Sequence, residues 1–296
     1  MDYEVRGFAR ASDGTRLFYG SRGRGAPVLL LDGIGCDGWA WNHIQPHLSA
    51  RHRVVHTHFR GHGRSGAPID PNAIDVGTLA DDAIAVANAA GLEHFAIIGH
   101  SMGTQVALEV YRRIPARIRS LILICGSYGR ITHTFHGNDF LSRVLPRLIE
   151  GVRKHRGLAR ALWGRLPPQL SWKVAGWIGE IDGGAVDVRD FAQYVEHLSD
   201  IDLDLYLTML QAAGEHTAED VLGGVSVPTL VIAAEKDTFT PVPVVRAVAD
   251  GIRGARFVEL AGATHSAPIE RANVINEEID VFLEDLGWVG RPSQVL

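Results

Sequence analysis

One pentapeptide constrains the fold of this chain more than any other segment: Gly99-His100-Ser101-Met102-Gly103. An apolar run over residues 95–98 precedes it, and apolar residues recur at helical spacing after it. This context predicts a strand, a sharp turn and a helix, with Ser101 at the apex of the turn. The glycines on either side of the serine let the strand and the helix approach closely without a Cβ clash. A serine held on such a turn is typical of an enzyme nucleophile.

Short apolar runs bounded by polar or glycine-rich turns recur along the chain, and such runs are typical of strands buried on both faces. Helical patterns, for example over residues 79–90 and 242–252, lie between most of them. The alternation predicts an α/β fold with a mostly parallel central sheet and helices on both faces. Segments 4–9 and 16–19 predict a hairpin at the sheet edge. The expected core strands are residues 28–31, 54–55, 95–98, 121–124, 230–233 and 257–260.

The alternation stops between residues 126 and 224, where no buried strand is expected. We interpret 126–224 as a helical lid inserted into a core made of residues 1–125 and 225–296. A second helical domain without a role at the site is the alternative. The tail 288–296 is expected to be poorly ordered. The lid's expected helical stretches are 140–149, 157–163 and 191–209, and its tryptophans are Trp163, Trp172 and Trp177.

Bulk composition excludes several classes of protein. The chain has 296 residues, a formal net charge of −5 and a pI near 6.3, which argues against nucleic acid or an anionic membrane as the main partner. No apolar run approaches the length of a membrane span, and the N-terminus lacks the pattern of a signal peptide. The two cysteines, Cys36 and Cys125, form no disulfide framework. We therefore expect a cytoplasmic protein.

A serine hydroxyl needs a base to take its proton and an acid to orient that base. In this architecture the three follow the order Ser, acid, His, with each at the carboxyl end of a strand. Asp237 follows the run 230–233, and His265 follows the run 257–260. We predict a Ser101–His265–Asp237 triad. Glu235 is the alternative acid, but it lies closer to its strand, and His100 is expected to pack rather than react.

An oxyanion that forms at the attacked carbonyl needs two preorganised N–H donors. The backbone N–H of Met102, directly after the nucleophile, is expected to be one of them. The other should come from the loop after the run 28–31, and we assign it to Ile34.

These features resemble the α/β-hydrolase superfamily, in particular its lidded serine esterases and lactonase-like members. The resemblance covers nearly the whole chain and includes Arg60-Gly61-His62-Gly63-Arg64-Ser65, which is similar to the family's Asp-x-Arg-Gly-x-Gly-x-Ser. It implies a carboxylesterase or lactonase that acts on a small-molecule substrate through an acyl-enzyme and needs no cofactor. Relatives with an aspartate nucleophile are disfavoured by Ser101.

The chain departs from the family pattern at two positions. Asp32 stands where the family has the histidine of its His-Gly, and His58 stands where it has the aspartate of its arginine motif. The resemblance implies that the strands before these two residues lie side by side, and neighbouring strands bring residues at matching heights to about 5 Å from each other. We therefore expect Asp32 and His58 to pair, with two independent solvated substitutions as the alternative.

Three other interpretations are weaker. The pattern Gly33-x-Gly35-x-x-Gly38 matches a dinucleotide-binding fingerprint, but no ribose-binding acid follows at the expected distance. Two histidine pairs, His43 with His47 and His56 with His58, have spacings seen in zinc sites but lack a complementing ligand set. Within the hydrolase fold, carbon–carbon hydrolysis, peroxide-dependent chemistry and acyl transfer remain open, as does a ligand-binding receptor with little turnover.

Overall fold

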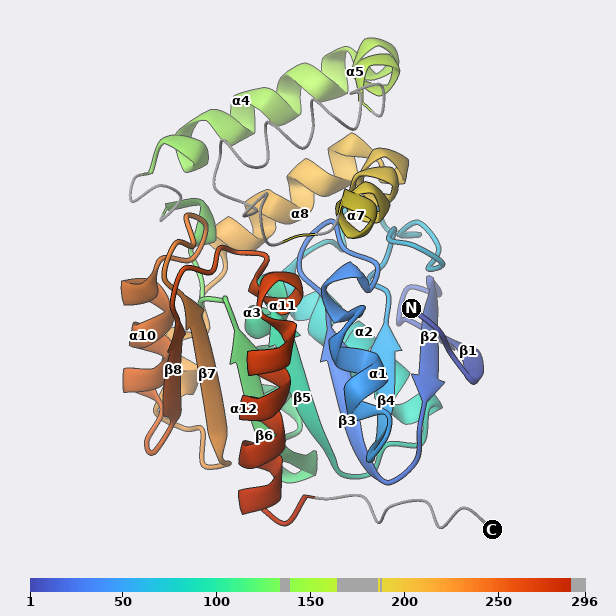
Figure 1. Cartoon of the computed structure of the whole chain (residues 1–296). Helices are drawn as coiled ribbons and strands as arrows, with labels where there is room; N and C mark the ends of the chain where they lie inside the picture. Colours follow the sequence, from blue (N-terminus) through green and yellow to red (C-terminus); the bar gives the residue numbers. More distant parts are fainter. Residues whose placement is uncertain (134–138, 164–185, 187, 289–296) are drawn as a thin grey trace.

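The computed structural model describes residues 1–133, 139–163, 186 and 188–288. An eight-stranded sheet in the order β1-β2-β4-β3-β5-β6-β7-β8 runs through the molecule (Figure 1). The strands β3 to β8 pair in parallel, while β2 pairs antiparallel with both β1 and β4. The strands are β1 (Val5–Arg10), β2 (Arg16–Arg22), β3 (Ala26–Leu31), β4 (His52–Thr57), β5 (Phe95–His100), β6 (Ile118–Ile124), β7 (Thr229–Ala234) and β8 (Arg256–Leu260).

The predicted α/β fold class is confirmed, and so is the hairpin at the sheet edge, formed by β1 and β2. Every expected core strand exists, and most are longer than the apolar run that indicated them. The largest difference is β4, which spans His52–Thr57 although only its two central valines form an apolar run. Its histidines His52 and His56 are buried, and they interrupt the apolar pattern that sequence reading depends on.

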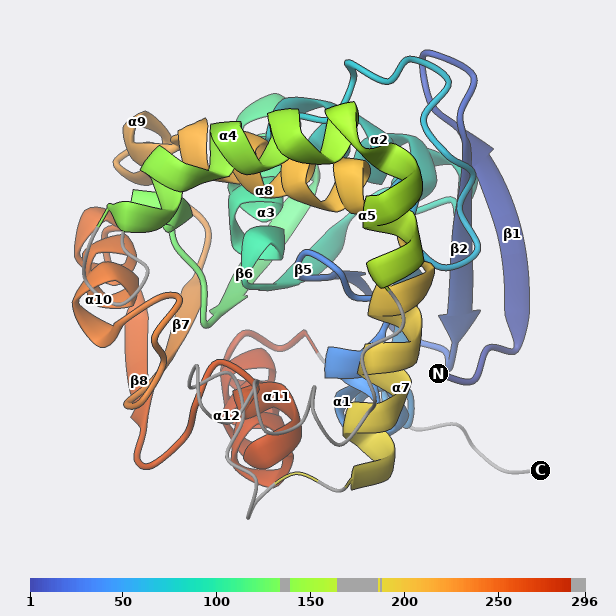
Figure 2. The same ribbon diagram turned by 90° about the horizontal axis from the view of Figure 1, so that it is seen from above.

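Helices cover both faces of the sheet, as Figure 2 shows from above. On one face α2, α3 and α10 pack their apolar sides into a large core, and on the other α1 and α12 enclose a second core. The short helices α9 and α11 lie beside these layers. The bounds are α1 (Ile44–Leu48), α2 (Val76–Ala89), α3 (Met102–Arg113), α9 (Glu219–Leu222), α10 (Val242–Gly251), α11 (Ala267–Glu270) and α12 (Ala272–Asp285), with 3-10 turns at Trp39–Trp41, Pro115–Arg117 and Ile131–His133.

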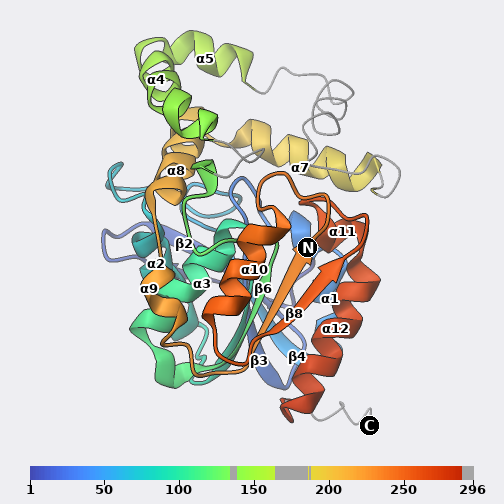
Figure 3. The ribbon, with the colours of Figure 1, turned by 90° about the vertical axis from the view of Figure 1, so that its left-hand side faces the viewer.

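Between β6 and β7 the chain leaves the sheet and builds a helical layer above the carboxyl ends of the strands (Figures 1 and 3). Its described helices are α4 (Phe140–Lys154), α5 (Arg156–Leu162), α7 (Val188–Asp200) and α8 (Leu203–Glu215). The stretch 191–209, expected to be helical throughout, is broken. Asp202 caps α8 by accepting a hydrogen bond from the backbone N–H of Leu205 at 3.1 Å, so the chain turns there.

Parts of the chain lie outside the described residues, among them Trp172, Trp177 and the tail from residue 289 onwards. Trp163 is described, and its indole N–H donates to the carbonyl oxygens of Leu198 and Ile201, each at 3.1 Å. It therefore holds the end of α5 against the end of α7. Within the described ranges, no helix is both long and apolar enough to cross a membrane.

Candidate functional site

Ser101 occupies a strained turn between β5 and α3. Its φ and ψ are 55° and −121°, in a region that residues with a side chain rarely adopt. The flanking glycines are required by close contacts. A Cβ on Gly99 would lie 2.4 Å from the carbonyl oxygen of Gly103, and one on Gly103 would lie 2.2 Å from the carbonyl oxygen of Leu31. The pentapeptide therefore permits a turn that packs directly against the end of β3.

The structure brings Ser101, His265 and Asp237 into one hydrogen-bonded line. His265 Nε2 lies 2.9 Å from Ser101 Oγ, and His265 Nδ1 lies 2.8 Å from Asp237 Oδ2. The three come from the ends of β5, β8 and β7, so parallel strands place them at one edge of the sheet. Ser101 is 8% exposed, so it lies largely shielded from bulk water.

The two candidate acids after β7 have different surroundings. The carboxylate of Asp237 is fully buried and accepts hydrogen bonds from the backbone N–H of Phe239 and of Thr240, and from the Thr240 hydroxyl, at 2.8–2.9 Å. These bonds fix the orientation of its side chain toward His265. Glu235 is exposed and accepts instead from the backbone N–H of Gly262 at 2.7 Å. The geometry thus favours Asp237.

The loop after β3, which contains Ile34, lies beside Ser101. A Cβ on Gly33 would lie 3.1 Å from Ser101 Cβ, so the loop backbone borders the serine side chain. Within the described ranges, no hydrogen bond occupies the backbone N–H of Ile34 or of Met102. Both groups are therefore free of the hydrogen bonds described here. We call residues 32–37 the oxyanion loop below, after the role that we propose for it.

The expected pairing of Asp32 with His58 is wrong. Asp32 is fully buried, and its Oδ2 lies 2.7 Å from Nε2 of His56. The β3–β4 ladder ends at Leu31 and Thr57. Beyond it the backbone N–H of His58 donates to Phe18 on β2 at 3.1 Å, which draws His58 away from β3. The carboxylate therefore pairs with the histidine two residues earlier on the same strand face.

The arginine motif that begins at Arg60 is a structural anchor. The guanidinium of Arg60 donates to both carboxylate oxygens of buried Asp82, at 2.6 and 2.7 Å. Ser65 donates to the carbonyl oxygen of His58 at 2.7 Å and accepts from the N–H of Phe18 at 2.9 Å. These bonds fasten the loop after β4 to β2 and α2, beside the oxyanion loop.

Two residues outside the predicted site hold the His265 loop. His100, which we expected only to pack, has its Nε2 3.1 Å from the carbonyl oxygen of His265. Glu270 accepts from the backbone N–H of Thr264 at 2.7 Å and from the Thr264 hydroxyl at 2.5 Å. In the sequence, Glu270 is marked only by its place five residues after the histidine, and this spacing is not specific enough to assign a role.

Helix α7 lies over the oxyanion loop. His197 Nδ1 is 3.3 Å from Asp37 Oδ2, and a Cβ on Gly35 would lie 3.1 Å from both Leu198 and Tyr206. Burial is the main factor that raises the pKa of the Asp37 carboxyl, and His197 opposes it. The helical layer thus contacts the loop that carries Ile34.

The discounted sites have other arrangements. Only a 3-10 turn and the five-residue helix α1 follow the glycine pattern at residues 33–38, unlike a dinucleotide fold. His43 pairs with Asp190 and His47 with Asp280, both on the surface. Within the described ranges no group of three potential ligands could hold a metal ion.

Burial raises the pKa of the Cys125 thiol, which makes it a poor nucleophile.

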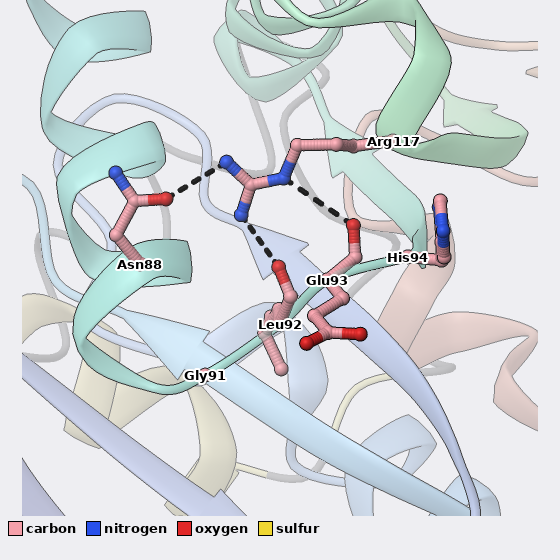
Figure 4. A pocket seen from close by; sticks show the side chains of 6 residues that line it. All are labelled: Asn88, Gly91, Leu92, Glu93, His94 and Arg117. Atoms are coloured by element: carbon pink, nitrogen blue, oxygen red, sulfur yellow. Dashed lines mark hydrogen bonds between the residues drawn. The ribbon is translucent and has the colours of Figure 1, made fainter.

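A hollow lined by residue 88, residues 91–94 and Arg117 lies at the amino end of β5 (Figure 4). Arg117 donates to the Asn88 side chain and to the carbonyl oxygens of Leu92 and Glu93, at 2.5–3.3 Å. The guanidinium therefore joins the turn before β6 to α2 and to the loop before β5.

Comparisons with known proteins agree with this fold. Residues 26–272 match the family model for the alpha/beta hydrolase fold. A protein of Azorhizobium caulinodans with the provisional name carbamate hydrolase RutD is 30% identical over 280 residues, covering 94% of this chain and 96% of the relative. The enol-lactonase of Burkholderia xenovorans LB400 (TM-score 0.73, 24% identity, 94% and 100% of the two chains) and an esterase of Exiguobacterium antarcticum (0.78, 20%, 94% and 98%) share the fold. The chain belongs to the α/β-hydrolase superfamily.

Proposed function

We propose that this protein is a serine hydrolase that cleaves a carboxylic ester or lactone through an acyl-enzyme. The observation that carries the proposal is the line from Ser101 Oγ through the His265 ring to the buried Asp237 carboxylate. In this assignment Ser101 is the nucleophile, His265 the base and Asp237 the orienting acid. Ile34 and Met102 supply the oxyanion donors.

The first half of the reaction would form the acyl-enzyme. Ser101 Oγ attacks the carbonyl carbon while its proton passes to His265 Nε2, and the carbonyl oxygen becomes an oxyanion at the N–H groups of Ile34 and Met102. Collapse breaks the bond to the alcohol, which leaves with the proton from His265. For a lactone both products belong to one chain, so the released hydroxyl remains attached to the acyl group.

The second half would release the acid. Water gives a proton to His265 and bonds to the acyl carbon. Collapse of the second oxyanion breaks the bond between the acyl carbon and Ser101 Oγ, which takes the proton back from His265. Asp237 stays ionised throughout and stabilises the imidazolium form of His265. The helices above the site, taken as a lid, would exclude competing water and favour small or medium acyl groups.

Hydrolysis of p-nitrophenyl esters of graded acyl length tests the proposal. Wild type should show multiple turnovers and a preference among acyl lengths, and Ser101→Ala should show none. A fluorophosphonate probe should label wild type at one site and leave Ser101→Ala unlabelled. Activity that persists in Ser101→Ala would contradict the nucleophile assignment. A folded wild type that is neither labelled nor active would instead favour a receptor-like protein with little turnover.

A carbamate is the second candidate substrate, because the relative at 30% identity is provisionally named a carbamate hydrolase. The same residues would form a carbamoyl-enzyme, whose carbonyl is less electrophilic than that of an ester. Parallel assays on a matched ester and carbamate separate the two, since an ester specialist would accumulate carbamoylated Ser101 without turnover.

Product analysis with peroxide or with an added alcohol tests perhydrolysis and acyl transfer, and β-diketone substrates test carbon–carbon cleavage.

A further inference from the structure

A buried chain of polar side chains runs from the N-terminal segment to the oxyanion loop. The Tyr3 hydroxyl lies 2.7 Å from His56 Nδ1 and 3.4 Å from His58 Nε2, and His56 Nε2 lies 2.7 Å from Asp32 Oδ2. Both Asp32 and His56 are fully buried. The family motifs given above include neither Tyr3 nor His56. The arrangement is built around Asp32, one of the two positions at which this chain departs from the family pattern.

The direction of each hydrogen bond can be assigned from one end of the chain. The backbone N–H of Arg64 donates to His58 Nδ1 at 3.0 Å, so the proton of the neutral His58 ring is on Nε2 and points to Tyr3. Burial lowers the pKa of His58 to about 2, which keeps this ring neutral. The Tyr3 hydroxyl then donates to His56 Nδ1, and the proton on His56 Nε2 is donated to Asp32.

Asp32 depends on His56 for its stability as a buried anion. Its other oxygen, Oδ1, has no hydrogen-bond partner among the described residues. A buried carboxylate without partners carries a large desolvation cost. The other titratable groups that Asp32 influences electrostatically are Tyr3, Asp37, His62 and His100.

The backbone of Asp32 also touches the nucleophile turn. A Cβ on Gly103 would lie 2.7 Å from the carbonyl oxygen of Asp32, and the next residue, Gly33, borders Ser101 Cβ. A shift of the Asp32 side chain would therefore displace the backbone that presents the N–H of Ile34. A full negative charge on Asp32, left without its partner, would in addition oppose the oxyanion.

We propose that Tyr3, His56 and Asp32 form a positioning relay that fixes the oxyanion loop and shields the oxyanion from the Asp32 charge. The inference rests on the proposed function, because it assigns a task in the same reaction. None of the three residues touches the reacting atoms in this assignment. They act through the backbone of the oxyanion loop and through the field at that loop.

The test is a double-mutant cycle read by kcat and KM. His56→Leu should lower kcat about 30-fold with little change in KM, less than the 10²–10³ caused by removing an oxyanion donor outright. Asp32→Asn with His56→Leu should return kcat to within about 5-fold of wild type, because no buried charge remains.

Two further variants keep the test independent of gross folding. Tyr3→Phe keeps the ring against Phe18 and removes only the hydroxyl, and it should lower kcat about 3-fold to 5-fold. His56→Gln can still donate to Asp32 and should recover part of the His56→Leu loss. The matched control is His47→Leu, which breaks the surface pair of His47 with Asp280 (2.8 Å) and should leave kcat unchanged.

The rate of labelling by the fluorophosphonate probe distinguishes the possible failures. If wild type is folded but neither labelled nor active, the proposed function itself has failed. If wild type and His56→Leu are both labelled and both turn over substrate equally fast, the relay is wrong. A double variant as impaired as His56→Leu would also overturn the relay, because a purely structural role predicts no recovery.

Discussion

His100 and His265 are joined by a hydrogen bond in which His100 Nε2–H donates to the carbonyl oxygen of His265 across 3.1 Å. Burial lowers the pKa of His100 to about 4, so the ring is neutral at physiological pH, and this bond requires its proton on Nε2. The ring of His100 also lies 5.1 Å from that of His265. The residue before the proposed nucleophile therefore holds the loop that carries the proposed base.

Replacing His100 by phenylalanine should lower kcat about 5-fold to 10-fold. A typical intramolecular hydrogen bond contributes about 1 kcal/mol net, and its loss would loosen the His265 loop without removing a reacting group. Steady-state kinetics on a p-nitrophenyl ester, together with thermal unfolding, measure the effect. A folded variant with wild-type kcat would show that His100 only fills space.

The two acids after β7 should respond very differently to neutralisation. Asp237→Asn is expected to reduce kcat by about 10⁴, because an amide no longer fixes the His265 tautomer or stabilises its cation. Glu235→Gln is the matched control, and we expect at most a 2-fold change, since among the described residues its side chain bonds only to the Gly262 N–H, away from His265. Similar losses in both variants would contradict the choice of Asp237.

One substitution, glycine to alanine, should have opposite effects at two positions. Gly103→Ala places a Cβ 2.2 Å from the carbonyl oxygen of Leu31, so it should prevent formation of the native turn. Gly151→Ala, on an exposed turn of α4, meets no atom within 4 Å and should stabilise the protein by about 0.5–1 kcal/mol. Soluble yield and chemical unfolding report the two outcomes, and a stable, active Gly103→Ala would refute the packing argument.

Acid should destabilise the protein through its buried histidines. Burial lowers the pKa of His62 and of His100 from 6.5 to about 4, and that of His58 to about 2. Between pH 6.5 and 4 the unfolded chain binds these protons and the folded chain does not, so acidification favours unfolding. Each such histidine costs at most about 1.4 kcal/mol per pH unit in this window.

Urea unfolding at pH 4.5–7.5 measures this effect as the slope of the unfolding free energy against pH. His62→Gln should flatten the slope by up to one proton, while the same substitution at exposed His155 is the matched control. A slope that does not change in His62→Gln would show that His62 is not kept neutral by burial.

The sequence by itself determined the features whose causes are local. The two glycines around Ser101 and the apolar runs on either side indicate a strand, a turn and a helix. Asp237 and His265 are predicted as its partners because each directly follows an apolar run that indicates a strand. These features could be predicted because backbone sterics and hydrophobic periodicity act over a few residues.

Only the tertiary structure decided which side chains meet. Asp32 bonds to His56 and not to His58. The β3–β4 ladder ends at Leu31 and Thr57, just before Asp32 and His58, and the backbone N–H of His58 then bonds to β2. His100 reaches the carbonyl oxygen of His265 because β5 and β8, with two strands between them, end at the same edge of the sheet. Such contacts join residues far apart in the chain, and spacing along one sequence holds no information on the side-chain directions that create them.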